Sequence, residues 1–279
     1  MRSAHSRIVV HMHDSLTTLK HRFRGHDWTP IADGCSGAEV WRLDGTTTLY
    51  LKLARRSPHP DSGFSPAGEA DRLVWLSGHG IPVPEVVGAG EHDDESWLIT
   101  TAVVGRSAAS PWPEEQRGGV VDALAGVARV LHSLPVTDCP FDRSLAVTVP
   151  NARRAAANGL VDLDDLDDDR EGWTVPRLLA QLEGTRPDTE ELVVCHGDLC
   201  LPNVILDPDT LAVTGLIDVG RLGTADRYSD LALATRSLSS ISLNPQFGEP
   251  YADRFLARYG EPAIDVQRLR FYRLLDEFF

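Results

Sequence analysis

Three polar residues in the second half of the chain have the types and the spacing that phosphoryl transfer requires. Asp198 and Asn203 are five residues apart in a turn between short apolar runs, and Asp218 follows the second run in Asp218-Val219-Gly220. Either aspartate alone would be a simple turn residue. Together, carboxylate and amide oxygens are the ligands that Mg²⁺ prefers. We therefore expect Asn203 and Asp218 to hold magnesium, and Asp198 to orient a hydroxyl and accept its proton.

A lysine and a glutamate in the first half of the chain complete this set. Alternation puts the side chain of Lys52 on the face opposite to the neighbouring leucines of its apolar run. In protein kinases such a strand lysine binds the nucleotide phosphates, and a glutamate on the next helix orients it. Glu69 is the candidate for that glutamate. A strand lysine alone is usually solvated, so the prediction depends on the whole ordered set.

The elements that must position Lys52 and Glu69 follow a polar leader. Val40 to Leu43 and Leu49 to Leu53 are predicted strands, joined by a turn at Asp44-Gly45. Ser65-Pro66 predicts the start of a helix, because serine caps helices and proline suits their first turn. The run Trp97 to Val104 is predicted to be a buried strand that ends before a glycine.

The second half is predicted to be mainly helical. Apolar residues at helical spacing predict a long helix around Val120 to Leu134 and a last helix over Asp265 to Phe279. Leu192 to Cys195 is a predicted strand, and Val204 to Leu206 with Leu211 to Ile217 is a predicted hairpin. We therefore predict a two-lobed α+β fold, with a nucleotide-binding lobe of sheet and helix over residues 1–104 and a larger, mainly helical lobe over residues 105–279.

Composition and charge argue against several classes of protein. The 279 residues include 27 basic and 41 acidic side chains, a net charge of −14, which disfavours nucleic acid and anionic membranes and favours a cationic ligand. No apolar segment near the N-terminus predicts secretion or membrane insertion, so we expect a cytoplasmic protein. We also expect a monomer or weak dimer. The four cysteines are too few for a disulfide framework. A metal site at Cys195 and Cys200 would need two further ligands at suitable spacing, so packing is the favoured role.

Several motifs resemble those of the aminoglycoside O-phosphotransferases. They are His196-Gly197-Asp198 followed by Asn203, the segment Ile217 to Arg221, and the segment Asp226 to Ala232. The acidic segment Gly159 to Asp168 and the terminal Leu274 to Phe279 resemble the neomycin and kanamycin 3′-phosphotransferases in particular. The resemblance covers most of the chain from the first hairpin onward. It implies a protein-kinase-like fold and an enzyme that transfers the γ-phosphate of ATP to the 3′-hydroxyl of kanamycin- and neomycin-type antibiotics, conferring resistance.

The resemblance implies the same roles for the reaction residues: phosphate binding by Lys52, its orientation by Glu69, catalysis by Asp198, and Mg²⁺ binding by Asn203 and Asp218.

The resemblance also adds residues on the nucleotide side. Ser36, in the loop Asp33 to Gly37, would donate to a β-phosphate oxygen, and the backbones of Thr101 and Val103 would hydrogen-bond to adenine. The loop lacks the Gly-x-Gly-x-x-Gly pattern of protein kinases, so its role depends on the resemblance alone.

Two histidines are expected to play structural parts. His196 would hold the loop of Asp198 rather than transfer a proton, and His132 is expected simply to lie on a helix face.

The expected substrate is a cationic aminoglycoside, whose ammonium groups need carboxylates. The resemblance selects Asp165, Asp167 and Asp168 from an acidic run that, without it, would equally well be a solvated or disordered segment. A second set of carboxylates at the end of the chain would complete the site, although a helix end can also simply fray. This second set consists of Asp276, Glu277 and the terminal carboxylate of Phe279.

Two arginines, Arg221 and Arg236, resemble positions that organise these acids. Isolated arginines are more often surface partners of little consequence.

Two other functions remain open. Streptomycin 3″-phosphotransferases share the His-Gly-Asp and Asp-Arg-Tyr segments, although the tail Leu-Asp-Glu-Phe-Phe favours the 3′ class. A catalytically inactive binding module of the kinase fold is the other alternative, but no reaction residue is substituted. A signalling protein kinase is disfavoured, because the seven residues between Asp218 and Asp226 are too few for an activation loop.

Overall fold

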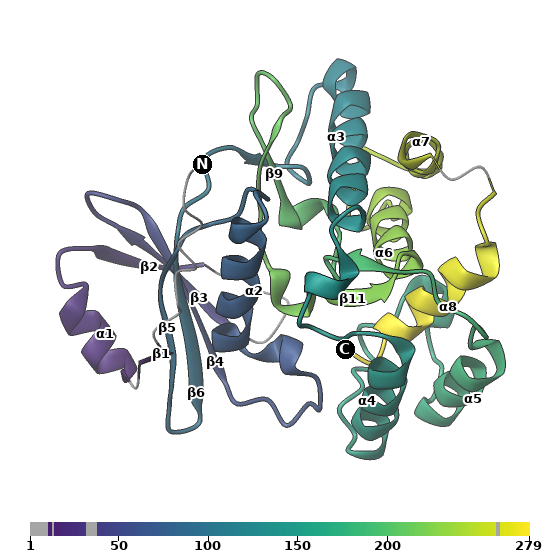
Figure 1. The fold of residues 1–279 in the computed structure, drawn as a ribbon, viewed down its shortest axis with the longest axis horizontal. Coiled ribbons are helices and arrows are strands. Elements are labelled where there is room, and N and C mark those ends of the chain that lie inside the picture. The colour runs from purple at the N-terminus through teal and green to yellow at the C-terminus, as the bar shows by residue number, and fades with distance from the viewer. Residues whose placement is uncertain (1–10, 13, 32–37, 261–262) are drawn as a thin grey trace. The chain divides into compact units, whose positions relative to one another are not determined.

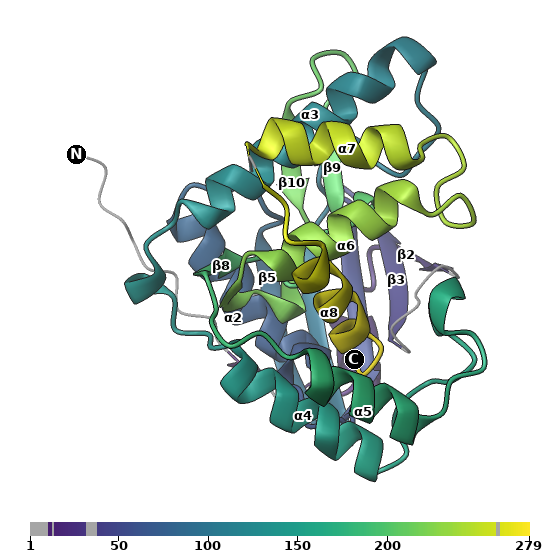
Figure 2. The ribbon, with the colours of Figure 1, turned by 90° about the vertical axis from the view of Figure 1, so that its right-hand side faces the viewer.

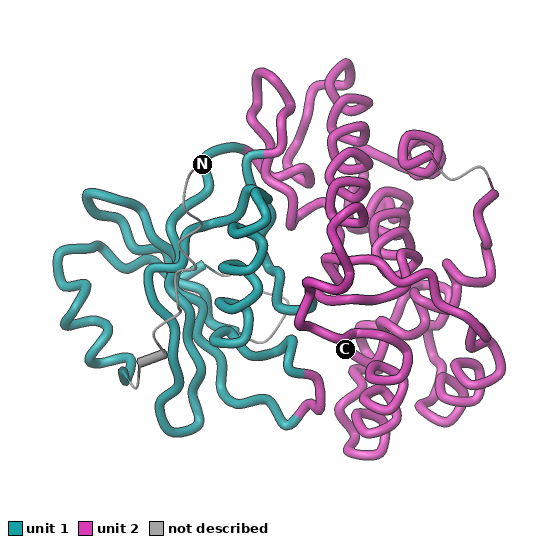
Figure 3. The backbone as a smooth tube through the Cα atoms, viewed as in Figure 1, with its two compact units in different colours: residues 1–58, 62–105, 214–221 teal, residues 59–61, 106–213, 222–279 magenta. Residues whose placement is uncertain are grey.

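The computed structural model of the chain describes residues 11–12, 14–31, 38–260 and 263–279. Two compact units divide the chain (Figure 3). The first consists of residues 1–58, 62–105 and 214–221, and the second of residues 59–61, 106–213 and 222–279. The chain passes from the first unit to the second after Gly105, beside the predicted boundary. Two short segments depart from this division, because residues 59–61 belong to the second unit and residues 214–221 to the first. The assignment of nucleotide binding to the first lobe stays a prediction.

A six-stranded sheet forms the first unit, with the order β1-β5-β6-β4-β3-β2 (Figure 1). β1 is parallel to β5, and the other neighbouring strands are antiparallel. The strands are β1 (His11–Met12), β2 (Asp27–Ile31), β3 (Glu39–Asp44), β4 (Leu49–Arg55), β5 (Val86–His92) and β6 (Glu95–Thr101), and the helices are α1 (Leu16–Arg22) and α2 (Pro66–Gly78). The predicted hairpin and the helix after it are confirmed. Helix α1 and strand β2, which lie in the polar leader, were not predicted.

The two faces of β4 have different surroundings. Leu49, Leu51 and Leu53 are buried in an apolar cluster together with Leu19 of α1 and residues of β3 and β6. Lys52 therefore faces the other side, where α2 packs against the sheet. The hydroxyl of Ser65 accepts the N–H of Gly68 at 3.3 Å, so α2 begins with the predicted serine cap and a proline in its first turn.

The predicted strand Trp97 to Val104 ends three residues early. β6 stops at Thr101, which pairs with Leu49, the first residue of β4. Beyond that register no residue of β4 remains to pair with, so the chain leaves the sheet and Val104 is 86% exposed. Apolar composition alone overestimated the strand.

In the part of the chain that the structure describes, six helices form most of the second unit. They are α3 (Glu114–His132), α4 (Leu145–Ala157), α5 (Val175–Thr185), α6 (Tyr228–Ser239), α7 (Glu249–Tyr259) and α8 (Val266–Asp276). Helix α6 packs against both α7 and α8, and α7 also packs against α3 (Figure 2). The predicted long helix and last helix are confirmed, although the apolar Val266 at the start of α8 is 52% exposed. No helix in the described part of the chain has the length and apolarity needed to span a bilayer.

Short antiparallel strand pairs in the second unit border the turn that carries Asp198. β8 (Leu192–Cys195) pairs with β11 (Gly223–Asp226), and β7 (Arg106–Ser107) pairs with β9 (Val204–Leu206). The chain passes from β8 through residues 196–203 into β9, so both ends of this turn are fixed by strands. β10 (Val213–Leu216) is the second strand predicted for the hairpin, and the chain changes unit within it.

Candidate active site

A lysine with two carboxylates is the charged centre of the first unit. Lys52 Nζ lies 3.0 Å from Glu69 Oε2 and 2.6 Å from Asp218 Oδ1. Strand β4 supplies the lysine, α2 supplies the glutamate, and the segment after β10 supplies the aspartate. Glu69 is also held from its other oxygen, because Oε1 accepts the N–H of Val219 at 3.2 Å. The structure thus brings together three residues that the sequence predicted to act on one nucleotide.

Burial and charge oppose each other in this group. Burial lowers the pKa of Lys52, but the carboxylates of Glu69 and Asp218 outweigh it, so the pKa lies above its ordinary value. Burial raises the pKa of Glu69, although Lys52 opposes the rise. The lysine therefore remains a cation at neutral pH, as phosphate binding requires.

The backbone around Asp218 has an unusual conformation and packs closely against another segment of the first unit. Asp218 has φ of +57°, a conformation that non-glycine residues rarely adopt. A Cβ on Gly220 would lie only 2.5 Å from the carbonyl oxygen of Gly63, so only glycine fits there. Close packing against Gly63 therefore explains the glycine in the motif Asp218-Val219-Gly220. The packed turn places the carboxylate of Asp218 beside Lys52.

Asp198 and Asn203 contact each other in the second unit. Asn203 Nδ2 donates to the carbonyl oxygen of Asp198 at 2.9 Å and to Asp198 Oδ2 at 3.0 Å. Because Nδ2 makes both contacts, Oδ1 is the atom that the buried Asn203 can offer to a cation. An amide oxygen here and the Asp218 carboxylate in the first unit are both hard donors, so their chemistry fits magnesium.

A buried carboxylate holds the loop that carries Asp198. Asp230, on α6, accepts the N–H of His196 and the N–H of Gly197, each at 2.8 Å. His132 Nε2 lies 3.1 Å from Asp230 Oδ2. Burial alone would raise the pKa of Asp230, but His132 outweighs it and holds the pKa below its ordinary value. The expectation that His132 is only a helix-face residue was therefore wrong, because its ring is nearly buried against Asp230.

His196 contributes to the same loop. Its ring is fully buried, and its Nδ1 accepts the N–H of Asp198 at 3.3 Å. That contact places the histidine at the backbone of the loop.

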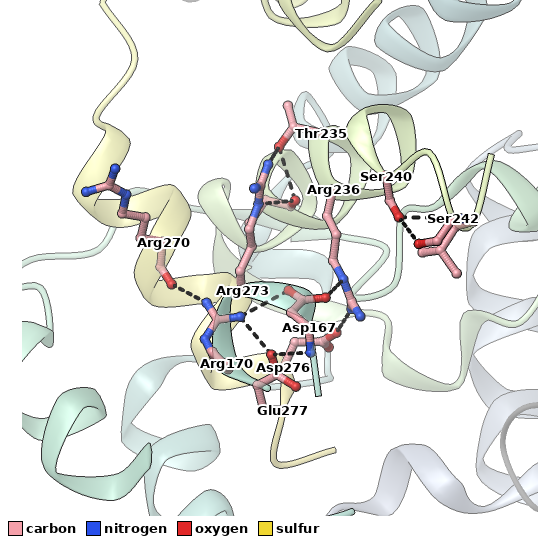
Figure 4. Close-up of polar contacts among 12 residues, drawn as sticks. Asp167, Arg170, Thr235, Arg236, Ser240, Ser242, Arg270, Arg273, Asp276 and Glu277 are labelled. Carbon is pink, nitrogen blue, oxygen red and sulfur yellow. Dashed lines mark hydrogen bonds and ion pairs between the residues drawn. The ribbon is translucent and has the colours of Figure 1, made fainter. Parts of the chain in front are cut away.

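Carboxylates from two distant segments of the second unit meet around two arginines (Figure 4). Arg236 contacts Asp167 through Nε, and its Nη1 lies 3.1 Å from Asp276 Oδ2. Arg170 Nη1 lies 3.0 Å from Asp167 Oδ2 and 2.7 Å from Glu277 Oε1. The acidic segment is thus joined to the end of α8.

Glu277 has an unusual proton affinity in this cluster. Burial, and after it the charge of Asp167, raises the pKa of Glu277 to about 7, although Arg170 and Arg236 oppose the rise. Its side chain is 4% exposed, which agrees with burial as the main cause. The charge of the cluster therefore changes near neutral pH.

The remaining predicted substrate residues are placed differently. Asp165 and Asp168 are exposed, and Arg221 lies in the turn Val219–Arg221 of the first unit. The N–H of Phe279 donates to the carbonyl oxygen of Asp276 at 3.0 Å, which continues the last turn of α8 to the end of the chain.

The predicted nucleotide contacts are described in part. Ser36 lies outside the described residues. Thr101 ends β6, and its N–H already donates to the carbonyl oxygen of Glu85 at 2.9 Å, so its carbonyl is the group it could offer to adenine. Val103 follows in the connecting segment after β6 and is partly buried.

Arg170 and the pair His132–Asp230 were missed as parts of the site. Arg170 stands within the acidic run and contacts Glu277, 107 positions later in the chain. No local pattern reveals such a contact. Asp230 does carry a sequence signal, because it belongs to the segment Asp226 to Ala232 that supported the family resemblance.

Comparisons with known proteins agree on one family. A family model described as "Phosphotransferase enzyme family" matches residues 27–272. The chain is 56% identical to an aminoglycoside 3′-phosphotransferase of Streptomyces fradiae, over 94% of this chain and 99% of that protein. It is similar to the crystal structure of an aminoglycoside-3′-phosphotransferase of type VIII, with a TM-score of 0.88, 54% identity, and coverage of 96% and 99%.

A more distant solved relative is the aminoglycoside phosphotransferase APH(3″)-Id of Streptomyces rimosus, in complex with ADP and streptomycin. The TM-score is 0.79 at 35% identity, over 94% of this chain and 96% of that one. These likenesses confirm the predicted α+β fold of the protein-kinase type.

Proposed function

We infer that this chain, which belongs to the phosphotransferase enzyme family and within it to the aminoglycoside O-phosphotransferases, transfers the γ-phosphate of ATP to the 3′-hydroxyl of kanamycin- and neomycin-type antibiotics. The observation that carries this function is the identity of 54–56% to aminoglycoside 3′-phosphotransferases over nearly the whole chain. The transfer confers resistance to these antibiotics. We propose that it acts in the cytoplasm, where ATP is available.

On the nucleotide side, Lys52 is proposed to bind phosphate oxygens while Glu69 fixes its ammonium group. The contacts of Lys52 support this role, because they hold a cation in a defined position before a nucleotide arrives. Ser36 and the backbones of Thr101 and Val103 are proposed to contact the phosphates and adenine. The ADP in the Streptomyces rimosus relative supports nucleotide binding in this family.

Asn203 and Asp218 are proposed to hold Mg²⁺, which supplies charge neutralisation at the phosphates. Asn203 keeps its amide oriented through its two contacts with Asp198, and Asp218 keeps its carboxylate oriented through Lys52. Both donors are therefore fixed by neighbours of their own unit.

Asp198 is proposed to orient the antibiotic hydroxyl and then to accept its proton. Because the transferring phosphoryl group passes through a loose transition state, positioning contributes more than the strength of the base. The contacts from Asn203 to Asp198, and from Asp230 to the preceding backbone, restrict the carboxylate in the way that such positioning requires.

On the substrate side, Asp167, Asp276 and Glu277 are proposed to bind ammonium groups of the antibiotic, with Phe279 adding its terminal carboxylate. In the structure Arg170 and Arg236 already contact these carboxylates. The arginines hold the acids in place and keep their mutual repulsion low. Asp165 and Asp168 are exposed and are proposed to contact the more solvated amines, and Arg221 is proposed to help organise the acids.

The position of the transferred phosphate tests this function. Kanamycin should be phosphorylated with release of ADP, whereas an analogue that lacks the 3′-hydroxyl should release no ADP above background. Phosphorus NMR of the kanamycin product should show coupling to the 3′ position. Equal turnover of the 3′-deoxy analogue would exclude the 3′-hydroxyl as the acceptor.

Streptomycin is a second candidate substrate, because the Streptomyces rimosus relative was solved with streptomycin bound. The lower identity of that relative, 35% against 54% for the 3′ enzyme, favours kanamycin. Cells that express the chain should be protected against kanamycin and remain sensitive to streptomycin. Protection against streptomycin alone would assign the chain to the 3″ class.

A further inference from the structure

The end of the chain contacts a group of side chains that the reaction does not use. His59 belongs to the second unit, as the C-terminus does, whereas the residues on either side of the segment 59–61 belong to the first unit (Figure 3). His59 Nε2 lies 2.7 Å from the carbonyl oxygen of Phe278, and its Nδ1 accepts the N–H of Asp61 at 3.1 Å. Both contacts are satisfied by a neutral ring that carries its proton on Nε2. The ring thus joins the C-terminal backbone to Asp61.

Arg143 fixes the other side of this group. Its Nη1 lies 2.7 Å from Asp61 Oδ1, and the two side chains are only 9% and 2% exposed. The N–H of Arg143 donates to the carbonyl oxygen of Thr224 in β11 at 2.9 Å, so the arginine is itself anchored to a strand. A buried and hydrogen-bonded ion pair is costly to disrupt. Asp61 therefore offers His59 a fixed support.

The ring of Phe279 contacts two members of the group, His59 and Arg143. Its centroid lies 5.4 Å from that of His59, and the guanidinium carbon of Arg143 lies 5.8 Å from it, within the range of aromatic and cation–π contacts. Phe278 is 1% exposed and is held through its carbonyl oxygen. The last two residues are thus held in different ways, one by its backbone and one by its ring.

We propose that His59, Asp61 and Arg143 form a clamp on the C-terminus, which positions the tail carboxylates for the antibiotic. The proposal rests on the proposed function and deepens its substrate side. A chain end without such contacts frays, and a frayed carboxylate must be ordered when the ligand binds. The clamp orders the tail when the protein folds, so that ligand binding does not have to order it. His59, Asp61 and Arg143 are therefore positioning residues that set the affinity for the antibiotic.

The clamp acts on ligand binding and leaves the phosphoryl transfer step alone. His59 and Arg143 contact Phe278 and Phe279, in the same tail as the carboxylates proposed to bind the antibiotic. Loss of the clamp should therefore raise the KM for kanamycin and leave kcat and the KM for ATP nearly unchanged. A general loss of structure would change all three quantities.

Steady-state kinetics of three variants test this split. His59→Ala should raise the KM for kanamycin about tenfold, the effect of one lost hydrogen bond and ring contact. His59→Gln keeps an N–H that can reach the Phe278 carbonyl, so it should recover part of the affinity. Arg143→Lys should give an intermediate rise, because lysine keeps the charge but loses the planar group.

A matched control is His79→Ala. The ring of His79 also contacts a backbone carbonyl, that of Trp75, at 2.8 Å, but it lies at the end of α2 in the first unit. This variant should keep the wild-type KM for kanamycin. An equal rise in His79→Ala and His59→Ala would overturn the clamp.

A chain shortened by Phe279 gives a second test that does not depend on the folding of His59→Ala. Removing Phe279 should raise the KM for kanamycin, and adding His59→Ala should then raise it by less than the product of the two single effects. If the KM of the double variant rises by the full product of the two single effects, the proposal is overturned. A wild-type chain that does not turn over kanamycin would refute the proposed function instead, whereas an active wild type with an unchanged His59→Ala refutes only the clamp.

Discussion

At the scale of single residues, the proposed chemistry depends on side chains whose contacts are made before any ligand arrives. Lys52 already contacts two carboxylates, and Asn203 already contacts Asp198 twice. Such preorganisation lowers the cost of reaching the transition state, because no side chain must be reoriented during the reaction. Each of these contacts can be tested by one substitution.

Asn203→Ala tests the magnesium role. It removes the amide oxygen offered to the metal and the contacts to Asp198, so the apparent affinity for Mg²⁺ should fall about 10- to 100-fold and kcat should also fall. The measurement is the rate at saturating ATP and kanamycin over a range of Mg²⁺ concentrations. Asp209→Asn, in an exposed turn of the same unit, should keep the wild-type dependence. An unchanged Mg²⁺ dependence in Asn203→Ala would remove Asn203 from the metal site.

Glu277 predicts a pH dependence of antibiotic binding. Because its pKa is raised to about 7, Glu277 is largely protonated below that pH and gains its negative charge as the pH rises through 7. The KM for kanamycin should therefore fall about tenfold over this range, until the antibiotic loses its own protons. Glu277→Gln should flatten the profile, and Glu171→Gln, at an exposed acid beside Arg170, should not. A steep profile in Glu277→Gln would assign the titration to another group.

Residue types and spacing selected the candidate reaction residues but not their partners. Lys52, Glu69, Asp198, Asn203 and Asp218 could be selected because each stands in a recognisable local pattern and their order along the chain is informative. Arg170 could not, because its contact with Glu277 depends on how two distant segments pack. Long-range ion pairs are set by tertiary structure, which local patterns do not encode.

At the scale of elements, α6 supports the loop of Asp198 through one buried carboxylate. Asp230→Ala would leave the N–H groups of His196 and Gly197 without this acceptor, at a cost of about 1–3 kcal/mol for each. The free energy of unfolding from urea titration should fall by that order, and kcat should fall with it. Ser239→Ala, at the end of the same helix, is the control. Full stability in Asp230→Ala would show that the loop does not need α6.

The contribution of Asp230 also has a defined pH range. Its pKa is held below the ordinary value, so the unfolded chain takes up this proton first as the pH falls. The stabilisation is complete above the ordinary pKa of about 4 and is lost below it.

Elements were predicted well where apolar periodicity or capping residues were strong. α2 has a recognisable start and α3 has a clear apolar face, and both were found. α1 was missed because only two leucines mark its apolar face, although Ser15 caps it by accepting the N–H of Thr18 at 3.3 Å. The end of β6 was missed because it depends on the length of its partner strand.

At the scale of the whole molecule, the net charge of −14 favours the approach of a polycation. Salt screens such attraction over about 8 Å at physiological ionic strength. The value of kcat/KM for kanamycin should therefore fall about tenfold between low and high salt, and that for ATP, which is an anion, should not fall. Stopped-flow binding of a fluorescent aminoglycoside would measure the effect on the association rate. A kcat/KM for kanamycin that does not respond to salt would leave the charge without a role in binding.

Asp198 provides the most direct test of phosphoryl transfer to an aminoglycoside. Purified chain with Mg·ATP should release ADP when kanamycin is added, and Asp198→Asn, which keeps the size of the side chain, should lower kcat by about 10²- to 10⁴-fold with little change in nucleotide binding. Absence of kanamycin-dependent ADP release from the wild-type chain, or equal release by Asp198→Asn, would contradict the account.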